Sequence, residues 1–197
     1  MKPNINRIAL FGTSADPPTK GHQCLLEGLL GIFPTVATWA SNNPMKSHFI
    51  GLEERKKLLE TLVQSINNEK LLFRQALSSP WTVKTIEIAS RTWPNSQLTF
   101  IIGSDLIQAI PTWLDVEQFI TKIIIGVVPR EGWPINKEGL SKIKSLGGNI
   151  EILPLIIPHS ASSEIRKYAK STDIPDAIKK SIIDENFYGI NRLNKNK

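Results

Sequence analysis

The segment from Gly12 to His22, GTSADPPTKGH, combines residue types that bind phosphate groups. Gly12 has no Cβ, so a ligand can approach the backbone closely there. Thr19 and His22 are three residues apart, and at the start of a helix such side chains point the same way. The first N–H groups of a helix also bind anions. The segment therefore predicts an imidazole and a hydroxyl at a phosphate; the alternative is a plain strand-to-helix connection with a capping histidine.

A second polar segment, SASSEIR, covers residues 160–166. Hydroxyl and free N–H groups at a helix start can hold phosphate oxygens, which makes Ser162 and Ser163 candidate ligands. Arg166, one turn further on, adds a forked and permanently charged donor. Taken alone, the segment also fits an N-capped helix with a surface arginine.

A third group lies in the middle of the chain, where Gly103-Ser104-Asp105 is followed by Trp113. Gly103 permits a close approach to the backbone, and Asp105 can accept hydrogen bonds from ribose hydroxyls. Trp113 offers a flat face for an aromatic ring. The alternatives are a helix cap for Asp105 and a core position for Trp113.

Alternating elements must position these groups, because short β-rich runs alternate with amphipathic helical patterns. This alternation indicates βαβ units in an α/β fold with a doubly wound parallel sheet, which is Rossmann-like and has a C-terminal helical end. Ligands in such folds bind at the carboxyl ends of strands, where the strand order reverses. The loops after the first, fourth and sixth strands are therefore the expected site. The pattern predicts strands at 6–11, 36–40, 71–75, 98–102, 123–128 and 150–155, and helices at 22–30, 52–66, 82–91, 116–119, 140–146, 163–169 and 176–184.

The first two segments resemble the signature of the HxGH/TxGH nucleotidyltransferase superfamily. The string FGTSADPPTKGH is similar to its first motif, and residues 160–166 are similar to its ISSTxIR motif. Ala15 stands where an aromatic residue is common, and Ala161 and Ser163 depart from the second motif. The resemblance implies that His22, Thr19 and Arg166 are catalytic. It implies ATP binding by Gly12, Thr13, Ser14, Thr19, His22, Gly103, Asp105, Ser162, Ser163 and Arg166.

Further segments resemble the nicotinate mononucleotide adenylyltransferase branch of this superfamily. Residues 103–113 are similar to its GxDxxxxLxxW pattern, 43–46 to NPxxK, 81–85 to YTxxT and 127–133 to VVxRxGY. The spacing before Lys46 is about one residue shorter than in the branch, so its register is open, and Lys46 and Arg130 also fit plain surface charges. The resemblance implies mononucleotide binding by Lys46, Thr82, Trp113 and Arg130.

The implied reaction moves AMP from ATP to nicotinate mononucleotide and gives deamido-NAD and pyrophosphate in NAD biosynthesis. Two anions must meet in line, so the protein mainly positions them and offsets their charge. Mg²⁺ is expected to arrive with ATP, without a protein metal site. Nicotinamide mononucleotide and phosphopantetheine are alternative acceptors, and Thr19 favours the second. A non-catalytic nucleotide-binding module is the alternative from another class.

Composition narrows the possible partners. The chain has 197 residues and a net charge of +6, which suits anionic small molecules. Its lysines are scattered rather than clustered, so no nucleic acid is expected. No run of eighteen apolar residues or secretory signal is present, so we expect no membrane contact and a cytoplasmic location. We expect a single domain over 1–197 with a flexible tail at 190–197, and a homo-oligomer is left open.

Overall fold

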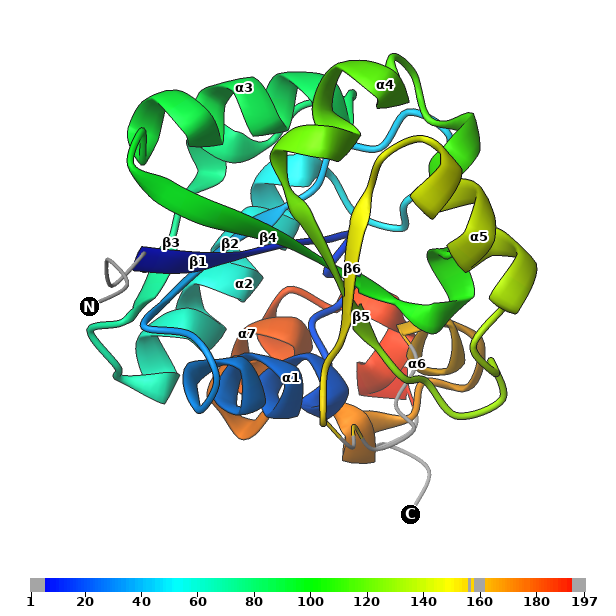
Figure 1. Ribbon diagram of the computed structural model, residues 1–197. Coiled ribbons are helices and arrows are strands. Elements are labelled where there is room, and N and C mark those ends of the chain that lie inside the picture. Colours follow the sequence, from blue (N-terminus) through cyan, green and yellow to red (C-terminus); the bar gives the residue numbers. More distant parts are fainter. Residues whose placement is uncertain (1–5, 156, 158–161, 193–197) are drawn as a thin grey trace.

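The computed structural model of the protein describes residues 6–155, 157 and 162–192. In this part of the chain, parallel strands form one six-stranded sheet in the order β3-β2-β1-β4-β5-β6 (Figure 1). The predicted doubly wound parallel sheet is thus confirmed. The strands are β1 (Asn6–Thr13), β2 (Thr35–Ala40), β3 (Leu71–Phe73), β4 (Ser96–Gly103), β5 (Ile124–Val128) and β6 (Asn149–Ile152).

The central strands are apolar on both faces because helices cover both faces. Ile8 and Leu10 of β1 face the core cluster that includes Ile86 and Ile143, whereas Ala9 packs in the cluster with Leu26 on the other side. Figure 1 shows α3, α4 and α5 on one face, and α1, α2 and α7 on the other. The helices are α1 (Lys20–Leu30), α2 (Leu52–Ile66), α3 (Thr82–Thr92), α4 (Val116–Phe119), α5 (Lys137–Ser145), α6 (Ser162–Tyr168) and α7 (Asp176–Asp184).

The strand order reverses at β1, which pairs with β2 on one side and with β4 on the other. The next elements of the chain leave in opposite directions from this point, so the loops after β1 and β4 open a crevice at the carboxyl edge of the sheet. β1 ends at Thr13 and β4 ends at Gly103. Both predicted phosphate and ribose segments therefore begin at the same edge.

The third and sixth strands are shorter than predicted. β3 ends at Phe73, and Gln75 begins the short 3₁₀ helix η1 (Gln75–Leu77). The Gln75 side chain accepts from the Ala40 N–H at 3.0 Å and donates to the Ala40 carbonyl at 2.9 Å. Its amide thus closes the end of β2 in place of a backbone ladder. β6 ends at Ile152, and Leu153 adds one further bond from its N–H to the carbonyl of Val127.

The predicted tail at 190–197 begins too early. Ile190 belongs to the 3₁₀ segment η6 (Phe187–Arg192) and is 2% exposed. It packs with Ile165 of α6 and Ile178 of α7, so an apolar contact fixes this position. Residues 193–197 lie outside the described residues. None of the described helices is long and apolar enough to cross a membrane.

Candidate active site

A cavity of about 1050 Å³ opens at the carboxyl edge of the sheet. Ligand pockets usually measure roughly 300–1,000 Å³, so this one has room for two substrates side by side. Most of the predicted site residues lie on its wall, although residues 160 and 161 of the second motif lie outside the described residues. The predicted residues that line the cavity are Gly12, Thr13, Ser14, His22, Lys46, Thr82, Gly103, Asp105, Trp113, Arg130, Ser162, Ser163 and Arg166.

Thr19 is not brought to the cavity, contrary to the predicted phosphate contact. It is fully buried as the N-cap of α1. Its hydroxyl accepts from the His22 backbone N–H at 3.3 Å and lies 2.8 Å from Nδ1 of the His22 ring. Its own N–H donates to the same Nδ1 at 3.1 Å. The two residues form a capping box, so Thr19 holds the imidazole and His22 alone faces the cavity.

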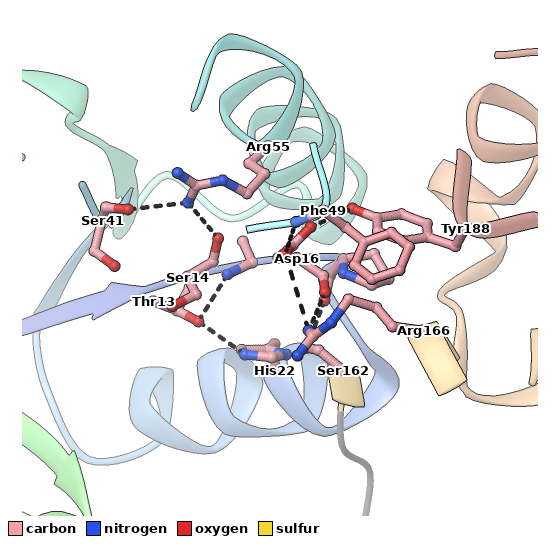
Figure 2. Close-up of polar contacts among 12 residues, drawn as sticks. Thr13, Ser14, Asp16, His22, Ser41, Phe49, Arg55, Ser162, Arg166 and Tyr188 are labelled. Atoms are coloured by element: carbon pink, nitrogen blue, oxygen red, sulfur yellow. Dashed lines mark hydrogen bonds and ion pairs between the residues drawn. The ribbon is translucent and has the colours of Figure 1, made fainter. Parts of the chain in front are cut away.

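The hydrogen bonds around His22 define which of its two ring nitrogens carries the proton. Nδ1 accepts the Thr19 N–H and therefore carries no proton in the neutral ring, so Nε2 carries it. Nε2–H donates to Oγ1 of Thr13 at 2.8 Å (Figure 2). Burial, and then the positive charge of Arg130, lower the pKa of His22 from 6.5 to about 4. The ring is thus a neutral N–H donor at neutral pH.

The lowered pKa of His22 makes stability depend on pH. Between pH 6.5 and about 4 the unfolded chain takes up a proton on His22 that the folded protein does not, so the free energy of unfolding falls as pH falls. From pH 7 to pH 5 we expect wild type to lose about 2 kcal/mol more stability than a His22→Gln variant. Urea unfolding of both proteins at the two pH values measures this difference. Equal losses in the two proteins would contradict a neutral, proton-resistant ring.

The two predicted motifs meet, although they are far apart in sequence. Arg166 of α6 donates from Nη1 to the Asp16 carbonyl at 2.6 Å. Ser162 donates its hydroxyl to the Pro17 carbonyl at 2.8 Å. The Ser162 hydroxyl therefore docks α6 on the first loop, and its proton is committed to Pro17. Ser163 is exposed at the cavity beside it.

Three aromatic side chains in a row line another part of the cavity. Trp113 meets Phe100 edge-on, with ring centroids 6.0 Å apart, and Phe100 lies 6.4 Å from Trp39. Trp113 therefore packs against the core and lines the cavity at once. A Cβ on Gly12 would come within 2.7 Å of the Trp39 ring. Gly12 is thus required by the rigid indole beneath it, and not by ligand approach alone.

Asp105 and Arg130 are predicted at different substrates, yet they pair with each other. Nη1 of Arg130 lies 3.1 Å from Oδ2 of Asp105. Gly103 leaves space for this carboxylate, since a Cβ there would lie 2.3 Å from Oδ1 of Asp105. The two charges balance across the mouth of the cavity, where both side chains stay partly exposed.

Lys46 and Thr82 lie on separate segments of the wall. Lys46 is exposed on the loop after β2, in a turn closed by its N–H and the Asn43 carbonyl at 3.2 Å. Thr82 is the first residue of α3. The neighbouring Trp81 also lines the cavity. The cavity thus brings the predicted mononucleotide residues together from the loops after β2, β4 and β5 and from the start of α3.

Sequence reasoning missed Ser104 as a site residue. Its buried hydroxyl donates to the Trp133 carbonyl at 2.6 Å and accepts from the Arg130 N–H at 3.0 Å. It thereby fixes the turn that carries Arg130. No sequence signal separates this serine from any small residue between Gly103 and Asp105.

Arg55 was also missed as a site residue. It is 2% exposed, and Nη1 donates to the carbonyls of Ser14 at 2.6 Å and Ser41 at 2.9 Å. It therefore ties the loop after β1 to the loop after β2. A signal existed, because Arg55 shares the helical face of Leu58, Leu59 and Leu62, and a charge on an apolar face needs buried partners.

Comparisons with known proteins agree with this geometry. Residues 10–176 match the cytidylyltransferase-like family. The chain is 30% identical over 197 residues to the "Probable nicotinate-nucleotide adenylyltransferase" of Synechocystis sp., covering 92% of this chain and 98% of that one. It is 27% identical to the nicotinate-nucleotide adenylyltransferase of Bacillus subtilis, covering 93% and 99%. Plasmodium falciparum nicotinic acid mononucleotide adenylyltransferase complexed with NaAD has a similar fold, with a TM-score of 0.78, 20% identity and coverage of 95% and 99%.

Proposed function

The chain belongs to the cytidylyltransferase-like family and, within it, to the nicotinate-nucleotide adenylyltransferases, and from this we infer that it transfers AMP from ATP to nicotinate mononucleotide. The products are deamido-NAD and pyrophosphate, in NAD biosynthesis. One observation supports this assignment above the others. A single cavity of about 1050 Å³ is lined both by the first loop and α6 and by Lys46, Thr82 and Trp113.

ATP is assigned to the end formed by the first loop, α1 and α6. We propose that the neutral His22 donates from Nε2 to the triphosphate near the reacting phosphorus, and exchanges its Thr13 partner for the ligand. Ser163 and Arg166 hold the β and γ phosphates. Thr13, Ser14 and Gly103 line the space for the rest of ATP, and Asp105 accepts from its ribose. Thr19 acts only by holding His22.

The mononucleotide is assigned to the other end of the cavity. Lys46 and Arg130 offset the phosphate and carboxylate charges, and the Trp113 face takes the pyridine ring with Thr82 beside it. The mononucleotide phosphate then attacks the α-phosphorus in line with departing pyrophosphate. No protein nucleophile takes part, because the cavity supplies position and positive charge rather than a covalent step.

Adenylyl transfer from ATP generally needs a divalent metal ion, and we propose Mg²⁺, brought in as Mg-ATP. Among the described residues no group of three or more His, Cys, Asp or Glu side chains could hold a metal ion. The donor set therefore fits an ion carried by substrate phosphates and water, as Mg²⁺ prefers. When bound, the ion offsets phosphate charge during transfer.

The predicted cytoplasmic location and single domain stay predictions.

A substrate comparison tests the proposed function. The protein is incubated with Mg-ATP and either nicotinate mononucleotide, nicotinamide mononucleotide or phosphopantetheine, and pyrophosphate release is measured. We expect nicotinate mononucleotide to give a kcat/KM at least about tenfold above the others, because Lys46 and Arg130 favour the extra carboxylate. A preference for either rival acceptor would reassign the substrate. Silence with all three, together with ATP binding, would indicate a non-catalytic nucleotide-binding module.

A further inference from the structure

A buried carboxylate joins distant segments beneath the ATP end of the cavity. Asp16, which is 1% exposed, accepts from the Tyr188 hydroxyl at 2.9 Å through Oδ1 and from the Phe49 N–H at 2.7 Å through Oδ2 (Figure 2). Arg166 Nη1 lies 4.0 Å from the same Oδ2 and donates to the Asp16 carbonyl. Both carboxylate oxygens are therefore occupied by donors from other parts of the chain.

Two of these donors belong to segments that line the cavity. Phe49 lies on the loop between β2 and α2 that also carries Lys46, and Arg166 lies on α6. Both Lys46 and Arg166 line the cavity. The Asp16 carboxylate thus connects a residue assigned to the mononucleotide with a residue assigned to the triphosphate.

Tyr188 is held as a permanent donor in this junction. It is buried in η6, and burial, followed by the negative charge of Asp16, raises its pKa far above its ordinary value. Its φ of 59° is in the left-handed region, which a bulky residue rarely adopts. Strained backbone of this kind persists only where surrounding contacts over-determine it, and it concentrates at functional positions.

We propose that the Tyr188–Asp16 pair is a positioning device for both substrates, which sets the Lys46 loop and Arg166 at a fixed separation. The proposal rests on the adenylyl transfer inferred above. Tyr188 touches neither substrate and acts through Asp16. Without its hydroxyl, Oδ1 of Asp16 has lost a buried donor, and the carboxylate turns toward other partners. The Phe49 loop and Arg166 then lose the carboxylate that fixes their relative position, and this happens in every folded molecule.

The test replaces Tyr188 with phenylalanine, which removes one oxygen atom. We expect KM for ATP and KM for the mononucleotide each to rise about fivefold or more, and the Phe49 amide to exchange its hydrogen faster. Tyr168→Phe is the matched control, since Tyr168 is 62% exposed on α6. It should leave both KM values and the Phe49 amide unchanged. The KM values come from steady-state kinetics, measured at a temperature about 20 degrees below the Tm of the variant. The exchange of the Phe49 amide is followed by NMR.

A merely structural role for Tyr188 would give a different result. Destabilisation lowers the number of active molecules, so apparent kcat falls while KM for both substrates stays at the wild-type value. That result, or an unchanged Phe49 amide, would overturn the proposal. Calorimetric titration with Mg-ATP keeps it separate from the proposed function, because binding and amide exchange need no turnover. Weaker Mg-ATP binding by Tyr188→Phe than by Tyr168→Phe supports the device even if no acceptor is turned over.

Discussion

Replacing His22 with alanine should lower turnover by at least about a hundredfold, the loss typical of a positioned donor at developing charge. The imidazole is a pre-aligned neutral donor, with Nδ1 fixed by Thr19 and Nε2–H aimed at Thr13. Burial and Arg130 keep it neutral, with a pKa of about 4, so at neutral pH it donates as a neutral imidazole through Nε2. The measurement is kcat for pyrophosphate release with saturating Mg-ATP and mononucleotide.

The His22→Ala variant keeps the Thr19 N-cap but loses the bond from the Thr19 N–H to the ring, so its fold needs a check. Loss of this half of the capping box should cost at most about 1 kcal/mol of stability, which a thermal melt reveals without loss of the folded state. Gln23→Ala is the matched control, because Gln23 lies next along α1 and bonds to the exposed Glu27. Near-normal kcat in a folded His22→Ala protein would remove His22 from the mechanism.

Replacing Arg166 with alanine should lower kcat/KM for ATP by about a hundredfold or more, as expected for loss of a charged donor at transferring phosphates. The side chain is anchored through Nη1 to the Asp16 carbonyl, and it lines the cavity. Initial rates over a range of Mg-ATP concentrations, at saturating mononucleotide, give the value.

Two further variants define what Arg166 contributes. Arg166→Lys keeps the charge without the fork and should recover only part of the loss. Lys167→Ala removes the neighbouring exposed charge on the same helix and should stay within about threefold of wild type. If Lys167→Ala lost as much as Arg166→Ala, general positive charge on α6 would explain the effect, and the phosphate role of Arg166 would be wrong.

Periodicity predicted the fold well because the central strands are continuous apolar runs and the helices carry clear apolar faces. The doubly wound sheet then located the cavity, since the loops after β1 and β4 must share an edge. Periodicity could not predict individual side-chain contacts such as that of Gln75, whose side chain bonds the backbone of Ala40 at the end of β2. Such a bond depends on tertiary geometry and leaves no periodic signal.

The sequence predicted which residues line the cavity better than it predicted which residues they bond to. His22 and Arg166 reach the cavity as expected, whereas Thr19 turns its hydroxyl to the histidine. Spacing places two side chains on one side of a helix start, but it does not say whether they face a ligand or each other. The same limit applies to Asp105 and Arg130, which pair across the cavity mouth. Residue types predict which groups can bind anions, and only the three-dimensional arrangement shows which groups bind one another.

The contacts of Asp16 also bear on the order in which the protein is made. Asp16 and Tyr188 are 172 residues apart, and Asp16 and Arg166 are 150 apart. A ribosome therefore delivers the first loop long before the chain that completes its contacts, and pairings over such distances form slowly. A nascent chain that ends at β5 carries Asp16 without its later partners Arg166 and Tyr188. We expect full ATP affinity to appear during synthesis only after η6 has emerged.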